Sequence, residues 1–62
     1  MCLSDVYCYD GGEEELIMKN AASVEQKDGM LTSSNIMGVP LEIKARIKTV
    51  DLMENVIVIE RN

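Results

Sequence analysis

The residues of this chain best suited to chemistry are its first three, Met1, Cys2 and Leu3. The terminal amine, the Cys2 backbone nitrogen and the Cys2 sulfur can close two adjacent chelate rings on one metal ion. Such a planar set suits nickel(II) or copper(II), which favour square-planar or tetragonal coordination. If Met1 is removed, the Cys2 amine, the Cys2 sulfur and the Leu3 amide form a comparable set. These residues therefore predict a metal site formed by Met1, Cys2 and Leu3.

Cys2 also has a simpler interpretation. Free cysteine usually behaves as a small buried hydrophobe, and in that role Cys2 merely opens a strand. In the metal interpretation the backbone amide must lose its proton to bind, so affinity rises with pH. The two interpretations of Cys2 both stay open at this point.

The length of the chain predicts one domain spanning residues 1–62, near the lower limit for a chain that folds alone. Chains this small usually need a disulfide, a metal or a partner subunit. In one strand, Cys2 and Cys8 would lie on the order of 20 Å apart, whereas a disulfide needs Cα atoms within about 7 Å. The chain is 47% hydrophobic without Phe or Trp, which predicts an aliphatic core with surplus apolar surface. We therefore expect a homodimer.

The charge balance argues against several classes of protein. The net charge is −5, with 11 acidic and 6 basic residues, so nucleic-acid binding is not expected. No apolar run approaches the roughly 20 residues that span a bilayer, and no signal-peptide pattern is present, so we expect a cytoplasmic protein and no membrane. There is no histidine, and no base stands beside a nucleophile. We therefore predict no enzymatic activity.

Alternating apolar residues and glycine-containing turns predict short strands throughout the chain. In the first strand the small uncharged residues Cys2, Ser4, Val6 and Cys8 are expected to face inward, which makes Cys8 a core thiol. The acidic run 13–15 is interpreted as the solvated start of a strand rather than a metal cluster. Val24 is expected to be the buried residue of the third strand. The predicted strands span residues 2–9, 13–20, 21–26, 30–36, 41–49 and 56–59.

The clearest alternation runs from residue 41 to residue 49. Apolar residues and Thr49 fall on one face, while Lys44, Arg46 and Lys48 fall on the other with Glu42. A strand explains this period of two better than a helix, because the stretch is rich in β-branched residues. The basic face is interpreted as a solvated surface, with a phosphate-binding strip as the alternative.

The last strand, residues 56–59, has four consecutive apolar residues and no polar face, so both of its sides are expected to be covered. One side would face the core, and the other is a candidate dimer seam. Five to six short strands with tight turns predict an all-β fold, a small, partly open SH3-like β-barrel. No segment requires a helix.

The whole-chain pattern resembles the CooT family, small nickel-binding proteins linked to the maturation of nickel-dependent carbon monoxide dehydrogenase. The matching stretches are 1–3, 6–7, 27–29, 36–38, 46–47, 50–52 and 55–60. The resemblance implies a homodimer of SH3-like barrels that binds nickel(II) at its interface through Cys2. Some relatives carry a histidine that this chain lacks, so its ligands would be Cys2 thiolates, backbone or terminal nitrogens and carboxylates. Cys8 is not a feature of the family pattern.

These observations predict a cytoplasmic nickel chaperone or store that serves a nickel enzyme such as carbon monoxide dehydrogenase. A different class remains as an alternative, a barrel that binds a protein partner through an exposed strand edge, with Cys2 merely structural. A third class is RNA binding through Lys44, Arg46 and Lys48, which the acidic balance disfavours.

Overall fold

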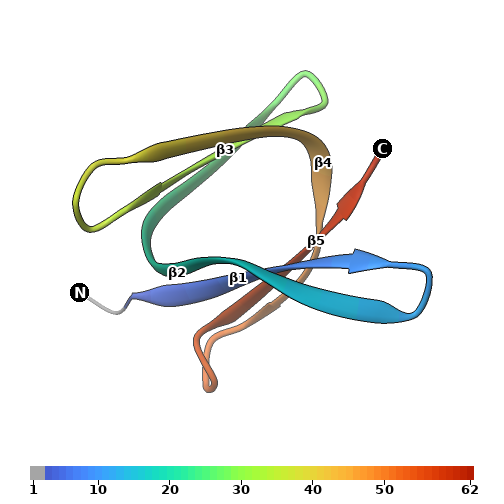
Figure 1. The fold of residues 1–62 in the computed structure, drawn as a ribbon, viewed down its shortest axis with the longest axis horizontal. Coiled ribbons are helices and arrows are strands. Elements are labelled where there is room, and N and C mark those ends of the chain that lie inside the picture. Colours follow the sequence, from blue (N-terminus) through green and yellow to red (C-terminus); the bar gives the residue numbers. More distant parts are fainter. Residues whose placement is uncertain (1–2) are drawn as a thin grey trace.

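The computed structural model describes residues 3–62, which form five strands joined in a closed ring (Figure 1). The strands are β1 (Ser4–Asp10), β2 (Glu13–Lys27), β3 (Met30–Asn35), β4 (Pro40–Asp51) and β5 (Val56–Arg61). Consecutive strands pair antiparallel, and the parallel pairing of β1 with β5 closes the ring. No helix occurs in this part of the chain. The predicted small all-β barrel is confirmed.

The two predicted glycine turns join the first three strands. Gly11 and Gly12 follow β1 with φ angles of 60° and 94°, and Asp28 and Gly29 follow β2 with φ angles of 51° and 79°. Two consecutive positive φ angles are what a tight two-residue hairpin requires, and Asp-Gly and Gly-Gly accept them at low cost. These turns therefore set the registers of β1 with β2 and of β2 with β3.

β2 corrects the prediction of two separate strands over residues 13–20 and 21–26. It is one strand of 15 residues, whose first half pairs with β1 and whose second half pairs with β3. The bend lies at Asn20, which has a φ of 58°, and the pairing register shifts on both sides of it. Asparagine tolerates this left-handed conformation, so the strand bends here without ending.

The core is small and aliphatic. Its buried residues are Val6, Cys8, Ala21, Leu31, Ala45 and Ile59. Val6 and Cys8 face inward as predicted, but Ala21 rather than Val24 is the buried residue after the bend, because Val24 is only partly buried. Ser33 is fully buried, and its hydroxyl donates a hydrogen bond to the Met18 sulfur at 3.0 Å.

The alternation predicted for residues 41–49 holds only through the first half of β4. Ala45 is fully buried, but the pairing register with β5 shifts between Ile47 and Thr49, and both of these residues are exposed. Such an irregularity re-aims the side chains that follow it. Ile47 precedes the shift, pairs with the fully buried Ile59 and is 38% exposed, whereas Thr49 follows the shift and is exposed. The alternation predicted for residues 41–49 is therefore not kept beyond the shift.

The last strand is covered on both sides at its centre, as its apolar run predicted. Val58 is 6% exposed and its neighbour Ile59 is fully buried, although consecutive strand residues point to opposite faces. The candidate dimer seam on the outer face of β5 is thus largely covered within the chain itself. The exposed apolar side chains lie mainly elsewhere.

A pair of leucine substitutions tests this description of the core. Leu31→Ala should lower the free energy of unfolding by about 2–4 kcal/mol, because it leaves a cavity at a fully buried position. Leu52→Ala should lower it by less than about 0.5 kcal/mol, because Leu52 is 82% exposed. Urea unfolding at one fixed protein concentration measures both, and equal losses would contradict the assignment.

Candidate functional site

The predicted ligand residues Met1 and Cys2 lie outside the described residues. Leu3 is partly buried and directly precedes β1. Asp5 then fixes the chain, because its backbone N–H donates to the Asn55 carbonyl oxygen at 2.9 Å and its Oδ1 accepts from the Asn20 N–H at 3.2 Å. The structure therefore determines where the chain enters the barrel, two residues after Leu3.

Two turns meet the barrel close to this entry point. Ala21 of β2 pairs with Ser4 on one side and with Asn35 on the other, which brings the start of the β3–β4 turn beside the start of β1. The hydrogen bond between Asp5 and Asn55 likewise brings the end of the β4–β5 turn beside the start of β1. The entry point thus lies between two turns that are far apart in the sequence (Figure 1).

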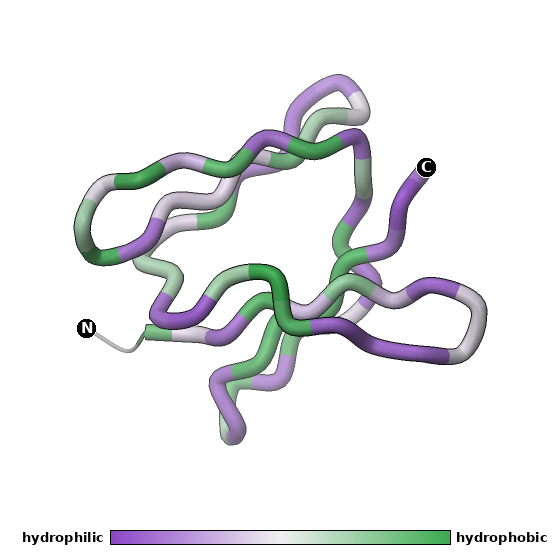
Figure 2. Tube along the Cα trace, in the orientation of Figure 1, coloured by the Kyte–Doolittle hydropathy of each residue, from purple (hydrophilic) through white to green (hydrophobic). Residues whose placement is uncertain are grey.

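Both turns expose large apolar side chains. Ile36, Met37 and Val39 are 58%, 83% and 55% exposed in the β3–β4 turn. Leu52 and Met53 are 82% and 94% exposed in the β4–β5 turn. Figure 2 shows hydrophobic residues in the β3–β4 turn and mostly hydrophilic ones in the β1–β2 turn at the other side of the view. The sequence predicted surplus apolar surface and turns near both sites, but it did not place that surface in these turns.

The β3–β4 turn is held in shape by Asn35. Its Oδ1 accepts hydrogen bonds from the N–H groups of Met37 and Val39 at 2.9 and 3.0 Å. Its carbonyl oxygen accepts from the Gly38 N–H at 2.9 Å, and its own N–H donates to the Val39 carbonyl oxygen at 3.2 Å. The turn is therefore ordered by polar contacts while its apolar side chains stay in solvent.

Cys8 lies toward the other end of β1. It is 3% exposed, carries a free thiol and belongs to the core, so the prediction of a core thiol is confirmed. It also lines a cavity of about 140 Å³ together with Asp10, Glu13, Glu15 and Arg61. Within residues 3–62, no three His, Cys, Asp or Glu side chains are grouped so as to hold a metal ion.

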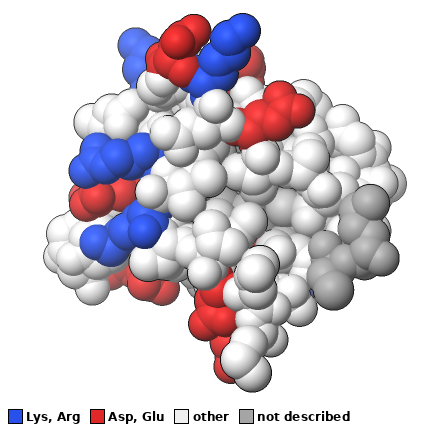
Figure 3. Space-filling view, turned by 180° about the vertical axis from the view of Figure 1, so that it is seen from behind, with Lys and Arg blue, Asp and Glu red and all other residues white. Residues whose placement is uncertain are grey.

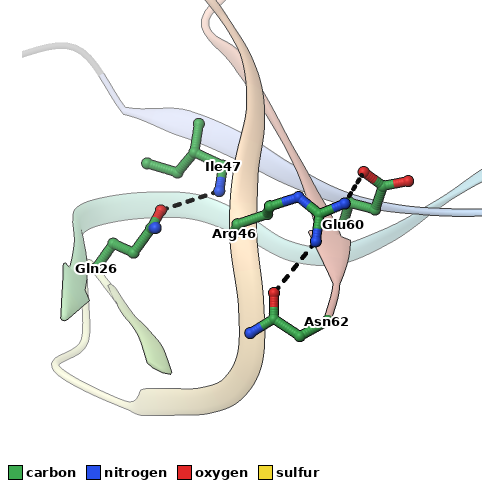
Figure 4. A network of polar contacts seen from close by, with 5 residues as sticks. All are labelled: Gln26, Arg46, Ile47, Glu60 and Asn62. Carbon is green, nitrogen blue, oxygen red and sulfur yellow. Dashed lines mark hydrogen bonds and ion pairs between the residues drawn. The ribbon is translucent and has the colours of Figure 1, made fainter. Parts of the chain in front are cut away.

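Arg46, in the middle of the predicted basic strip, is engaged within the chain (Figure 4). Its Nη2 donates to Glu60 Oε1 at 2.9 Å and its Nη1 donates to Asn62 Oδ1 at 3.3 Å. Next to it, the Ile47 N–H donates to Gln26 Oε1 at 3.0 Å and ties β4 to β2. These contacts give Arg46 a structural role at the junction of β4 and β5.

Lys48, at the end of the same strip, lies over the ring of Tyr9, with its Nζ 4.3 Å from the ring centre. Lys44 is exposed. In Figure 3, basic atoms along one side of the molecule are interleaved with acidic atoms. Two of the three basic residues thus have partners in the protein, which favours the solvated-surface interpretation over a phosphate-binding strip.

The described residues form a small closed β-barrel in which the start of β1 lies between two exposed apolar turns. The chain belongs to the CooT family, because a family model described as CO dehydrogenase accessory protein CooT matches residues 1–60. This assignment confirms the resemblance inferred from the sequence, and it makes the chain a member of a family of accessory proteins.

A solved structure supports the assignment. The crystal structure of a protein described as a CooT candidate, from Carboxydothermus hydrogenoformans, is 30% identical and superposes with a TM-score of 0.90. The similarity covers 98% of each chain. No curated protein matches the chain. The described residues contain no helix long and apolar enough to cross a membrane.

The buried position of Cys8 predicts its reactivity. In the Cys2→Ser variant, Cys8 is the one remaining thiol, and it should react with a water-soluble disulfide reagent far more slowly in the folded protein than in urea. Absorbance of the released thiolate follows the reaction. Equally fast reaction of the folded and the unfolded protein would contradict the core position.

Proposed function

We propose that this protein binds nickel(II) as cargo and carries or stores it for the maturation of a nickel enzyme such as carbon monoxide dehydrogenase. The observation that carries the proposal is the match to the accessory-protein family over residues 1–60, which includes a cysteine at position 2. The family description names an accessory protein, so we propose no catalytic step for the chain.

The donor atoms of the first residues fit this cargo. The Met1 amine, the Cys2 backbone nitrogen and the Cys2 thiolate offer two nitrogens and one sulfur, and the Leu3 amide replaces one nitrogen if Met1 is removed. Nitrogen and thiolate ligands in one plane suit nickel(II). Copper(II) generally binds such ligands more tightly, so the choice of nickel would depend on which metal is available to the protein.

We further propose that the metal lies at the interface of a homodimer. Three donors leave one position of a square-planar ion open, and Cys2 of the partner subunit would reach it across a two-fold axis. A chain of net charge −5 associates with its own copy most readily through surface without charged groups. Residues 35–41 carry no charge, and the side of the molecule that bears their turn is mostly uncharged in Figure 3.

One observation favours a second candidate function. The exposed apolar turns would also suit a protein-interaction module in which Cys2 has no metal role. RNA binding has less support, because Arg46 and Lys48 have partners within the chain. Loss of nickel binding on substitution of Cys2 separates the first function from the second.

The test of the nickel site is a titration of the purified protein with nickel(II). The wild type should bind one nickel per dimer in native mass spectrometry, with a thiolate-to-nickel absorption band. The Cys2→Ser variant should lose this binding at least about a hundredfold, because the substitution removes the Cys2 thiolates of both subunits from the site.

Cys8→Ala is the matched control, because it removes the buried thiol and leaves Cys2 in place. It should bind nickel as the wild type does. Equal weak binding by the wild type and Cys2→Ser would overturn the metal site and favour the interaction module.

The pH dependence provides an independent check. Nickel affinity should rise steadily from about pH 6 to about pH 8, because the thiol and the backbone amide must both lose protons when they bind the metal. Isothermal titration in several buffers should also show proton release on binding. A constant affinity without proton release would exclude the deprotonated donor set.

A further inference from the structure

The geometry points to the tip of the β4–β5 hairpin, residues 51–55, as the element that docks the enzyme this accessory protein serves. The predicted contact surface on that enzyme is an apolar cleft rimmed by Lys or Arg. The inference rests on the accessory role within the proposed function, and it does not require the nickel site. Figure 3 shows this hairpin as a projection from the body of the molecule.

The tip exposes two adjacent apolar side chains. Leu52 is 82% and Met53 is 94% exposed, more than most other large apolar residues of the described chain. Single exposed apolar residues are common, but a neighbouring pair at the end of a projection is typical of an interaction site. Methionine adds adaptability, because its unbranched side chain fits irregular apolar surfaces.

The backbone of the tip is held in one conformation. Asp51 Oδ1 accepts hydrogen bonds from the N–H groups of Met53 and Glu54 at 3.0 and 2.9 Å. Asn55 takes a left-handed conformation with a φ of 56°, and its carbonyl oxygen accepts from the Asp5 N–H at 2.9 Å. A loop that is already ordered loses little entropy when it binds, so these contacts favour recognition.

Charge distinguishes this tip from the other apolar turn. Leu52 and Met53 lie between the exposed acidic residues Asp51 and Glu54, whereas the β3–β4 turn is uncharged from residue 35 to residue 41. A two-fold contact through the tip would bring like carboxylates together, which opposes self-association. The acidic flanks are instead complementary to a basic rim on a different protein. The two turns therefore suit different partners.

The tip of the β4–β5 hairpin lies beside the start of β1. The bond from Asp5 to Asn55 joins the tip to the start of β1, two residues after Leu3. An enzyme bound to Leu52 and Met53 would thus lie beside the segment where the chain enters the barrel. Cargo held by the first residues would have a short path to that enzyme.

The test uses purified, nickel-free carbon monoxide dehydrogenase from the same organism, immobilised for a binding measurement. The double variant Leu52→Ser/Met53→Ser should bind at least about tenfold more weakly than the wild type, because it removes the apolar anchors. Leu16→Ser, at a leucine that is 45% exposed on β2 outside the hairpin, should bind as the wild type does.

Two charge-reversal variants test whether the acidic flanks of the tip contribute to docking. Glu54→Lys should weaken binding by about threefold to tenfold and flatten its salt dependence, because it removes attraction to the basic rim. Glu14→Lys makes the same charge change at an exposed residue of β2 and should have a smaller effect. If the two variants weaken binding equally, the affinity depends only on the net charge of the protein, and the docking site at the tip is overturned.

Three other results would overturn the inference. They are no binding of the enzyme by the wild type, no loss of binding in Leu52→Ser/Met53→Ser, and a monomeric double variant in native mass spectrometry. The last result would place the tip in the contact between two copies. A nickel titration of the double variant separates the docking test from the test of the metal site. The double variant should bind nickel as the wild type does and yet fail to bind the enzyme.

Discussion

The structure depends on the position of β1, which pairs antiparallel with β2 and parallel with β5. The parallel pairing joins the first strand of the described chain to the last, so the ring closes only when almost the whole chain is in place. Asp5 lies where these pairings begin and bonds to Asn20 and Asn55 at once. Contacts between residues this far apart in the sequence cost chain entropy when they form. Once formed, they fix the start of β1 from both sides.

This constraint connects the fold to the proposed function. Because Asp5 is held by the bend of β2 and by the β4–β5 turn, the start of β1 lies at a defined place between two apolar turns. The β3–β4 turn is uncharged, and the β4–β5 turn carries acidic flanks. In the proposed function, one end of this small barrel would hold the metal ligand, a surface for a second copy and a surface for a different protein.

Local residue chemistry was enough to predict the turns and the first strand, because the positive φ angles at Asp28 and Gly29 depend mostly on the residue type. The bend at Asn20 and the register shift after Ile47 were not predicted, because both depend on pairing with distant strands. The family and the buried state of Cys8 were predicted correctly. The site at Cys2 stays a prediction, since it lies outside the described residues.

The central claim is that the Cys2 thiolate binds nickel(II), and X-ray absorption at the nickel edge tests it most directly. The nickel-loaded wild type and Cys8→Ala should both show sulfur together with nitrogen in the first coordination shell, with the edge features of a planar ion. Cys2→Ser loaded at high nickel concentration should show nitrogen and oxygen only. A six-coordinate shell of oxygen and nitrogen in all three proteins would contradict the account and leave Cys2 with a structural role.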